Sequence, residues 1–252
     1  MEPVCLASAV LTIRTVAETG STNADLLALA ARGVEEGVWL RAERQSAGRG
    51  RQGRAWVSPP GNFSGSTLVR LRPADPPAPT LALVAGVAAE DAVATFMALG
   101  PAAPADAGGL ALKWPNDLLL GGAKLAGILL ERAGDAVVVG IGVNLAHHPE
   151  LAERPTTSLA AHHAAVEPQV FAETLAEAFA RWLARWRGEG LAPVRRRWLD
   201  RAHAPGTAIT ARLPDGENLD GLFDGLDRDG ALILRLASGD ARVIHAGDVF
   251  LI

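Results

Sequence analysis

Short apolar segments separated by turn-forming residues dominate the middle of the chain and predict a β-sheet. Pro, Asn, Asp and Gly residues break the apolar pattern every few positions. Such regularly spaced turn-forming residues are typical of hairpins in an antiparallel or mixed sheet. The expected central strands cover residues 110–114, 118–120, 125–131 and 136–143. Further strands are expected at 10–16, 38–42 and 67–71.

Apolar residues at helical spacing predict helices around this sheet. The largely apolar run 80–99 indicates a helix that is buried on several sides. A shorter helix is expected over 26–32, because Thr22 and Asp25 have capping-box spacing just before it. A further helix ends near Gly188 and carries an aromatic face, which we interpret as a core stripe, formed by Phe171, Leu175, Phe179, Trp182 and Trp186.

The last part of the chain has the pattern of a small β-barrel. Turn signals at 214–216, 227–230 and 238–240 divide it into four or five short strands. We therefore expect two domains, with boundaries at residues 1–203 and 204–252. The fold class is α+β, with a mixed or antiparallel sheet that is flanked by helices.

Composition narrows the classes of function. The net charge of −4 argues against binding to phosphate backbones, so we expect no nucleic-acid partner. The apolar runs are broken before membrane-spanning length, and we expect no membrane association. The single cysteine, Cys5, excludes an internal disulfide, and the chain start lacks a cationic signal region, so we expect a cytoplasmic protein. The charge run 195–197 is expected to be solvated.

A glycine- and arginine-rich segment, residues 44–56, follows a predicted strand and is expected to be a loop. Glycine backbone amides close around anions, and guanidinium groups bind carboxylate or phosphate oxygens with two parallel hydrogen bonds. The segment therefore suits an acidic small molecule. A solvated basic loop and an RNA-binding arginine-glycine tract are alternatives. The segment matches neither the P-loop nor the dinucleotide fingerprint.

Only two of the 24 basic residues are lysines, and both lie close together, at Lys113 and Lys124. Lysine offers a compact ammonium that can stabilise charge on a phosphate during transfer. The alternative is an ordinary hairpin with exposed lysine tips, which the spacing alone slightly favours. The segment 140–145 ends a strand with glycines that permit close approach of a ligand. We assign no metal to the histidine pairs His147-His148 and His162-His163, because they lack partner carboxylates in the sequence.

Taken together and in this order, these segments resemble the biotin-protein ligases, also called biotin–[acetyl-CoA-carboxylase] ligases. The resemblance rests on residues 21–23, 48–56, 113–117, 124–129, 140–145 and 155–159. It implies a catalytic domain like that of class II aminoacyl-tRNA synthetases, with a small SH3-like β-barrel at the C-terminus. It also implies an ATP- and Mg²⁺-dependent reaction in which biotin becomes biotinyl-5′-AMP, pyrophosphate leaves, and biotin passes to a lysine of a biotin carboxyl carrier domain.

The resemblance also implies roles for individual residues. Biotin would contact Ser21, Thr22, Asn23, Gln45, Gly48, Arg49, Gly50, Arg51 and Lys124. The nucleotide would contact Arg51, Arg54, Trp56, Asn116, Lys124 and Asn144. Lys124 and Arg51 would be the catalytic cations. Asp117 would hold Mg²⁺ or cap the turn, and we favour the turn; no metal ligand is assigned.

Three points qualify the resemblance. The motifs begin by residue 21, so we expect a ligase without the N-terminal helix-turn-helix domain of the family's larger members. The sequence leaves open whether the protein forms a homodimer. The alternatives are a lipoate- or octanoate-protein ligase or acyltransferase of the same superfamily, and a non-catalytic biotin sensor.

Overall fold

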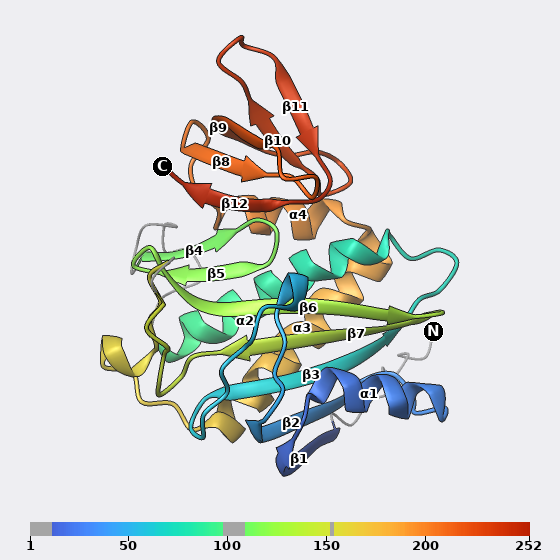
Figure 1. Cartoon of the computed structure of the whole chain (residues 1–252). Coiled ribbons are helices and arrows are strands. Elements are labelled where there is room, and N and C mark those ends of the chain that lie inside the picture. The colour runs from blue at the N-terminus through green and yellow to red at the C-terminus, as the bar shows by residue number, and fades with distance from the viewer. Residues whose placement is uncertain (1–11, 98–108, 152–153) are drawn as a thin grey trace, which may run out of the picture.

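A seven-stranded sheet forms the body of the molecule, and a smaller five-stranded sheet sits above it (Figure 1). The computed structural model describes residues 12–97, 109–151 and 154–252. The large sheet has the order β1-β2-β3-β7-β6-β5-β4. Its strands are β1 (Thr12–Thr19), β2 (Val38–Gln45), β3 (Phe63–Arg70), β4 (Leu110–Lys113), β5 (Asp117–Leu120), β6 (Ala123–Ala133) and β7 (Ala136–Val143).

The sheet is mixed, as the sequence pattern predicts. Strands β1 and β2 pair in parallel, and every other neighbouring pair of this sheet is antiparallel. The hairpin-linked strands β4 to β7 match the expected central strands within a few residues. The start of the expected strand at 10–16 lies outside the described residues, and its described part continues to Thr19.

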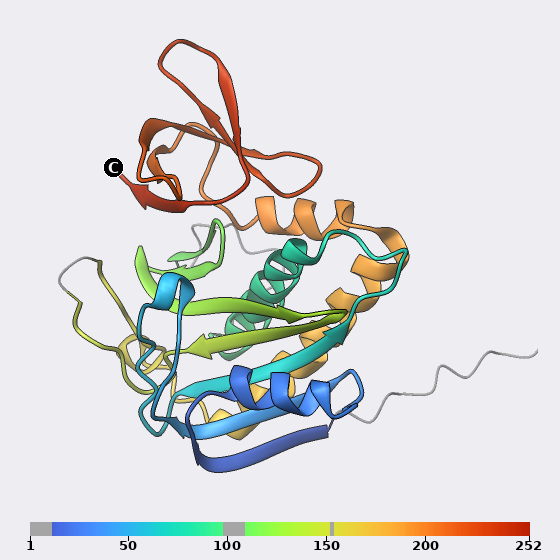
Figure 2. The same ribbon diagram turned by 45° about the vertical axis from the view of Figure 1, so that its right-hand side comes forward.

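Helices cover both faces of the large sheet (Figure 2). The helix α1 (Thr22–Ala31) lies on one face, while α2 (Leu81–Phe96) and α3 (Pro168–Glu189) lie on the other. Short 3-10 turns at Arg51–Gly53, Ala78–Thr80 and Ala160–His162 complete the helical elements with α4 (Ala192–Leu199). The predicted aromatic stripe of α3 is buried and packs in the main core, which confirms its interpretation.

Side chains along β7 alternate between the two faces of the sheet, which pack against different helices. Ile141 and Val143 are buried in the main core with α2 and α3. Val138 points the other way and packs with Leu26 of α1 in a smaller cluster. Since side chains alternate along a strand, Gly140 and Gly142 face the α1 side. A strip of the sheet surface on that side is therefore free of side chains.

The C-terminal sheet packs on the far edge of the large sheet. Its order is β11-β10-β9-β8-β12, with all neighbours antiparallel. The indole N–H of Trp114 donates to the Gly230 carbonyl at 3.2 Å, so the turn after β4 is tied to this sheet. The strands are β8 (Ala208–Arg212), β9 (Asn218–Leu226), β10 (Leu232–Arg235), β11 (Ala241–Ile244) and β12 (Asp248–Leu251).

Two local expectations are wrong. The helix α1 begins at Thr22 with Ser21 as its N-cap, and no side-chain cap bond forms. The charge run 195–197 is not solvated throughout, because Arg197 pairs with Glu90 at 2.6 Å. In contrast, the expected burial of the apolar helix is confirmed. The segment Ala78–Phe96 is long and apolar enough to span a membrane, but 72% of its most apolar window is buried inside the fold. It serves as a core helix.

Candidate active site

A pocket opens on the α1 side of the large sheet, beneath the glycine-rich loop. Its volume is about 610 Å³, open solvent included. The N-terminus of α1, the end of β2, the loop, and strands β6 and β7 supply its walls. The expected site residues that line it are Ser21, Thr22, Asn23, Gln45, Arg49, Gly50, Arg51, Arg54, Trp56, Asn116 and Lys124.

Neutral hydrogen-bonding groups form one end of the pocket. The Gln45 Oε1 atom accepts from the backbone N–H of Thr22 at 2.8 Å and from its hydroxyl at 3.1 Å. The Asn23 Oδ1 atom accepts from the Ser66 hydroxyl at 2.6 Å. Thr22 and Asn23 are buried. These bonds fix the orientation of uncharged donors and acceptors, which is what recognition of a polar, neutral ring requires.

Glycines form the floor of the pocket. A Cβ atom at Gly140 would overlap the Asn23 amide, and one at Gly142 would overlap the Trp56 indole. A Cβ at Gly127 would lie 3.3 Å from the same indole. At positions 140 and 142, only glycine therefore leaves room for Asn23 and Trp56 against the sheet.

A β-bulge directs the central lysine toward the pocket. In the β5–β6 pair, Leu118 faces Ala126, whereas Leu119 already faces Lys124. Bulges of this kind turn a side chain to a new face and occur next to active sites. The bulge brings the Lys124 ammonium onto the face that carries Asp117, and the two groups form an ion pair.

Lys124 is a buried cation. Its side chain is 10% exposed, and its ammonium lies 5.8 Å from the centroid of the Trp56 ring. Burial lowers the pKa of Lys124 below its ordinary value, and the Asp117 carboxylate acts in the opposite direction. Lys113 behaves in the same way, with burial as the main cause of its lowered pKa. The expectation of exposed lysine tips is therefore wrong.

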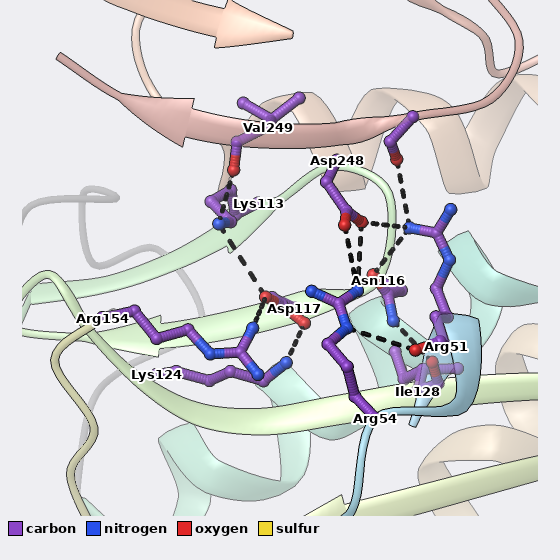
Figure 3. Close-up of polar contacts among 11 residues, drawn as sticks. Arg51, Arg54, Lys113, Asn116, Asp117, Lys124, Ile128, Arg154, Asp248 and Val249 are labelled. Atoms are coloured by element: carbon purple, nitrogen blue, oxygen red, sulfur yellow. Dashed lines mark hydrogen bonds and ion pairs between the residues drawn. The ribbon is translucent and has the colours of Figure 1, made fainter. Parts of the chain in front are cut away.

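The glycine-rich loop folds back over the pocket and is held by the C-terminal sheet (Figure 3). Within the loop, the Trp56 N–H donates to the Gly48 carbonyl at 2.9 Å. Arg51 and Arg54 both reach Asp248 of β12, at 3.1 Å and 3.0 Å. Arg51 also donates to Asn116 Oδ1 at 3.4 Å. The loop is thus tied to two separate parts of the chain.

Two expected residues do not line the pocket. Gly48 is buried in the loop, where a Cβ would lie 2.5 Å from the Trp56 carbonyl oxygen, so its role is to let the loop close. Asn144 is 2% exposed, and its Nδ2 donates to the Thr157 carbonyl at 2.9 Å. Within the described chain, the Asn144 Oδ1 atom has no hydrogen-bond partner, although buried acceptors are normally satisfied.

Asp117 does not act as a turn cap. Its carboxylate is 8% exposed and lies among Lys124, Lys113 at 3.8 Å and Arg154 at 3.9 Å. No hydrogen bond from this carboxylate to the turn backbone occurs among the residues that the structure describes. The preference for a capping role is corrected: Asp117 is the counter-ion of a cation cluster.

Sequence reasoning missed several acidic and basic partners. Asp248 lies far from the motifs along the chain, and Arg154 directly precedes the segment 155–159, to which no side-chain role is assigned, so spacing carried no signal for either residue. Glu131 is the last residue of the expected strand 125–131, yet its carboxylate accepts a hydrogen bond from Asn23 Nδ2 at 2.8 Å and pairs with Arg49 at 3.2 Å. Its alternation with Leu129, which lines the pocket, is the one signal that could have located it.

The arrangement suits an elongated acid that must react with a second anion. One end of the pocket is neutral and hydrogen-bonding, the middle is a smooth glycine floor, and the other end is cationic. Fixed cations in a water-poor site lower the repulsion between two anions and stabilise charge that develops in a transition state.

Family models and two relatives match most of the chain. The model of the biotin/lipoate A/B protein ligase family matches residues 18–145, and that of the biotin protein ligase C terminal domain matches residues 206–252. The biotin–[acetyl-CoA-carboxylase] ligase of Paracoccus denitrificans is 46% identical over 246 residues, covering 93% of this chain and 98% of that protein. Its namesake from Mycobacterium tuberculosis is 39% identical over 240 residues, covering 93% and 86%.

A solved structure is similar over nearly the whole chain. The biotin protein ligase from Aquifex aeolicus in complex with biotin and ATP has a TM-score of 0.83 at 22% identity, and the match covers 96% of this chain and 99% of that one. At this identity the similarity shows a shared fold. The expected fold class, a mixed sheet with helices and a small C-terminal β-domain, is confirmed.

Proposed function

Because this chain belongs to the biotin/lipoate A/B protein ligase family, we propose that it is an ATP-dependent biotin-protein ligase. In the first step a biotin carboxylate oxygen bonds to the α-phosphorus of ATP. The bond from this phosphorus to the β-phosphate breaks, which gives biotinyl-5′-AMP and pyrophosphate. In the second step a lysine amine of a biotin carboxyl carrier domain attacks the biotinyl carbonyl and displaces AMP.

One observation carries the proposal: the pocket is neutral and hydrogen-bonding at one end and cationic at the other. The ureido ring of biotin offers N–H donors and a carbonyl acceptor, which suit Thr22, Asn23 and Gln45. Its apolar ring and chain suit the glycine floor beside Trp56. Its carboxylate then lies toward Lys124, where a buried ammonium favours the anion.

The nucleotide would occupy the side of the pocket nearer the loop. Trp56 offers an aromatic surface on which adenine can stack. The Oδ1 atom of Asn144 has no hydrogen-bond partner in the described chain, but Asn144 does not line the pocket, so its contact with the nucleotide stays a prediction. Arg51, Arg54 and Asn116 lie on the phosphate side. Arg49, Gly48 and Gly50 would hold the loop closed over the mixed anhydride, which excludes water from a hydrolysable product.

Positioning and electrostatics would carry the chemistry. Lys124 would touch both the biotin carboxylate and the α-phosphate, so that two anions meet without repulsion. Arg51 would leave Asp248 to bind the same phosphate. Mg²⁺ stays a prediction: no group of three or more His, Cys, Asp or Glu side chains converges in the described part of the chain. A magnesium ion would be held mainly by nucleotide phosphates, as is common for this ion.

Further parts of the proposal concern the setting of the reaction. The acceptor is a carrier domain of a biotin-dependent carboxylase, and the protein acts in the cytoplasm without nucleic-acid or membrane partners. We also propose that residues 1–203 form the catalytic unit and residues 204–252 a separate C-terminal unit. A homodimer is compatible with this organisation.

Pyrophosphate release tests the proposal and its nearest alternative. Purified protein with ATP, Mg²⁺ and biotin is expected to release pyrophosphate, and replacement of biotin by lipoate or octanoate is expected to abolish the release. The variant Lys124→Ala, checked for folding by circular dichroism, is expected to lose adenylation because the central cation is gone. Release with lipoate or octanoate instead of biotin would favour a lipoate-type ligase. Biotin binding without any release would favour a sensor.

A further inference from the structure

A buried carboxylate in the middle of α2 belongs to Glu90, and we infer that it positions the C-terminal sheet over the active site. Glu90 does not line the pocket. It acts through two arginines, Arg197 of α4 and Arg201 of the connector, residues 200–207, which joins α4 to β8. The inference rests on the proposed function and adds a positioning residue to it.

Glu90 and the two arginines form a buried ion cluster inside an apolar core. The Glu90 side chain is 1% exposed, and α2 around it is made mainly of buried Ala, Val and Leu residues. Its Oε2 atom lies 2.6 Å from Arg197 Nη2, and its Oε1 atom lies 3.2 Å from Arg201 Nε. A buried ion cluster adds little net stability compared with apolar residues of similar size. Its fixed directions suit a positioning role instead, because one carboxylate joins α2 to both α4 and the connector.

Both segments that the ion cluster holds are in contact with other parts of the site's frame. Figure 1 shows α4 between the C-terminal sheet and α2. From α4, Arg195 Nε donates to the Leu226 carbonyl of β9 at 2.9 Å. The connector runs beside β4, where Leu112 N donates to the Arg201 carbonyl at 2.7 Å. The ion cluster therefore fixes the C-terminal sheet at α4 and at the strand that leads into the Lys113 turn.

The C-terminal sheet reaches the active site through β12. Lys113 Nζ donates to the Val249 carbonyl at 2.8 Å. The neighbouring Asp248 pairs with Arg51 and Arg54 of the glycine-rich loop (Figure 3). A shift of β12 against the large sheet would move Asp248 away from both loop arginines. Because misplacement by about 1 Å is enough to lose most of a rate that depends on positioning, the docking of this sheet has to be accurate.

Replacing the ion cluster by apolar residues separates positioning from stability. For the triple variant Glu90→Met/Arg197→Met/Arg201→Met we expect a urea midpoint at or above the wild-type value, since apolar side chains of similar volume replace such clusters without loss of stability. We expect faster tryptic cleavage within the loop 44–56. The KM for ATP is expected to rise roughly tenfold, the size of one lost hydrogen bond to a charged group. The KM for biotin is expected to stay unchanged, because the proposed ureido contacts lie on α1 and β2.

A double-mutant cycle tests whether the ion cluster acts through Asp248. When Asp248→Asn is added to the triple variant, tryptic cleavage is expected to be no faster than for Asp248→Asn alone, because coupled sites are not additive. Additive effects of the two changes would overturn the inference. The matched control Arg185→Met/Glu189→Met removes an exposed ion pair of α3 with a 3.0 Å contact and is expected to behave as wild type.

The remaining outcomes are also decisive. A stable triple variant with wild-type loop cleavage and wild-type KM for ATP would overturn the inference, as would one that loses biotin and ATP binding equally. If the triple variant does not fold, Arg197→Met keeps the pair of Glu90 with Arg201 and is expected to be cleaved faster than wild type; unchanged cleavage would overturn the inference. Loop cleavage needs no substrate, so a wild-type protein that releases no pyrophosphate with biotin contradicts the proposed function alone.

Discussion

The variant Asp117→Asn tests whether the cation cluster is electrostatically coupled. The Asp117 carboxylate is 8% exposed and faces Lys124, Lys113 and Arg154. Removing one partner of a buried ion pair leaves the other charge uncompensated and costs about 3–5 kcal/mol. Because Arg154 is partly exposed and the pairs of Asp117 with Lys113 and Arg154 are long, we expect the lower end, about 3 kcal/mol of the free energy of unfolding.

The same substitution has a distinct effect on the pH dependence of adenylation. Lys124 must be protonated to act as a cation, so the rate falls as pH rises through its pKa. Burial already lowers this pKa, and Asp117 is the group that raises it. Without the carboxylate the pKa falls further, and the alkaline limb of the rate profile is expected to move to lower pH.

Urea denaturation and pyrophosphate release across neutral to alkaline pH measure these two effects. The matched control is Asp135→Asn, since Asp135 is 62% exposed and pairs with Arg70 at 3.4 Å on the surface. Surface pairs contribute about 0–1 kcal/mol, so the control is expected to keep both its stability and its alkaline limb. If Asp117→Asn matched the control in both measurements, the electrostatic reasoning would be refuted.

Two further predictions concern the floor and the loop. Gly142→Ala places a Cβ on the Trp56 indole and is expected to weaken the binding of biotinyl-AMP, measured by calorimetry, about tenfold, as for one displaced aromatic contact. The control Gly188→Ala adds a methyl group in open space on α3 and is expected to bind biotinyl-AMP normally. Equal affinities of the two variants would contradict the role of the glycine floor. Asp248→Asn removes the ion pairs of Arg51 and Arg54 with β12 and is expected to speed tryptic cleavage within the loop. Asp240→Asn, on an exposed turn, is expected to leave the cleavage rate unchanged. Equal cleavage rates of the two variants would show that Asp248 does not hold the loop.

The elements of the fold were predictable because their signals are local. Turn residues between short apolar runs located β4 to β7, and helical spacing of the aromatic residues located the face of α3 that enters the core. The N-cap of α1 was not predictable in the same way. Thr22 has the right spacing for a capping box, but its hydroxyl hydrogen-bonds to Gln45 and Ser66 instead. Tertiary contacts override a local preference there.

The candidate site was predictable only where function is carried by contiguous motifs. Many residues of the loop and of the segment 124–129 line one pocket, whereas the segment 113–117 contributes only Asn116. Asp248 reaches the same region from a distant part of the chain through the docking of β12. Arg154 reaches it because the adjoining segment 155–159 pairs with the backbone of Lys124. The role of Asp117 was misjudged because the β6 bulge, which turns Lys124 toward it, leaves no mark in the sequence.

A crystal structure with a non-hydrolysable analogue of biotinyl-AMP would test the central claim most directly. The account predicts the ureido ring beside Thr22, Asn23 and Gln45, the phosphate within hydrogen-bond distance of Lys124, and the loop 44–56 closed over both. An analogue bound away from Lys124, or with its ureido ring at the cationic end, would contradict the account.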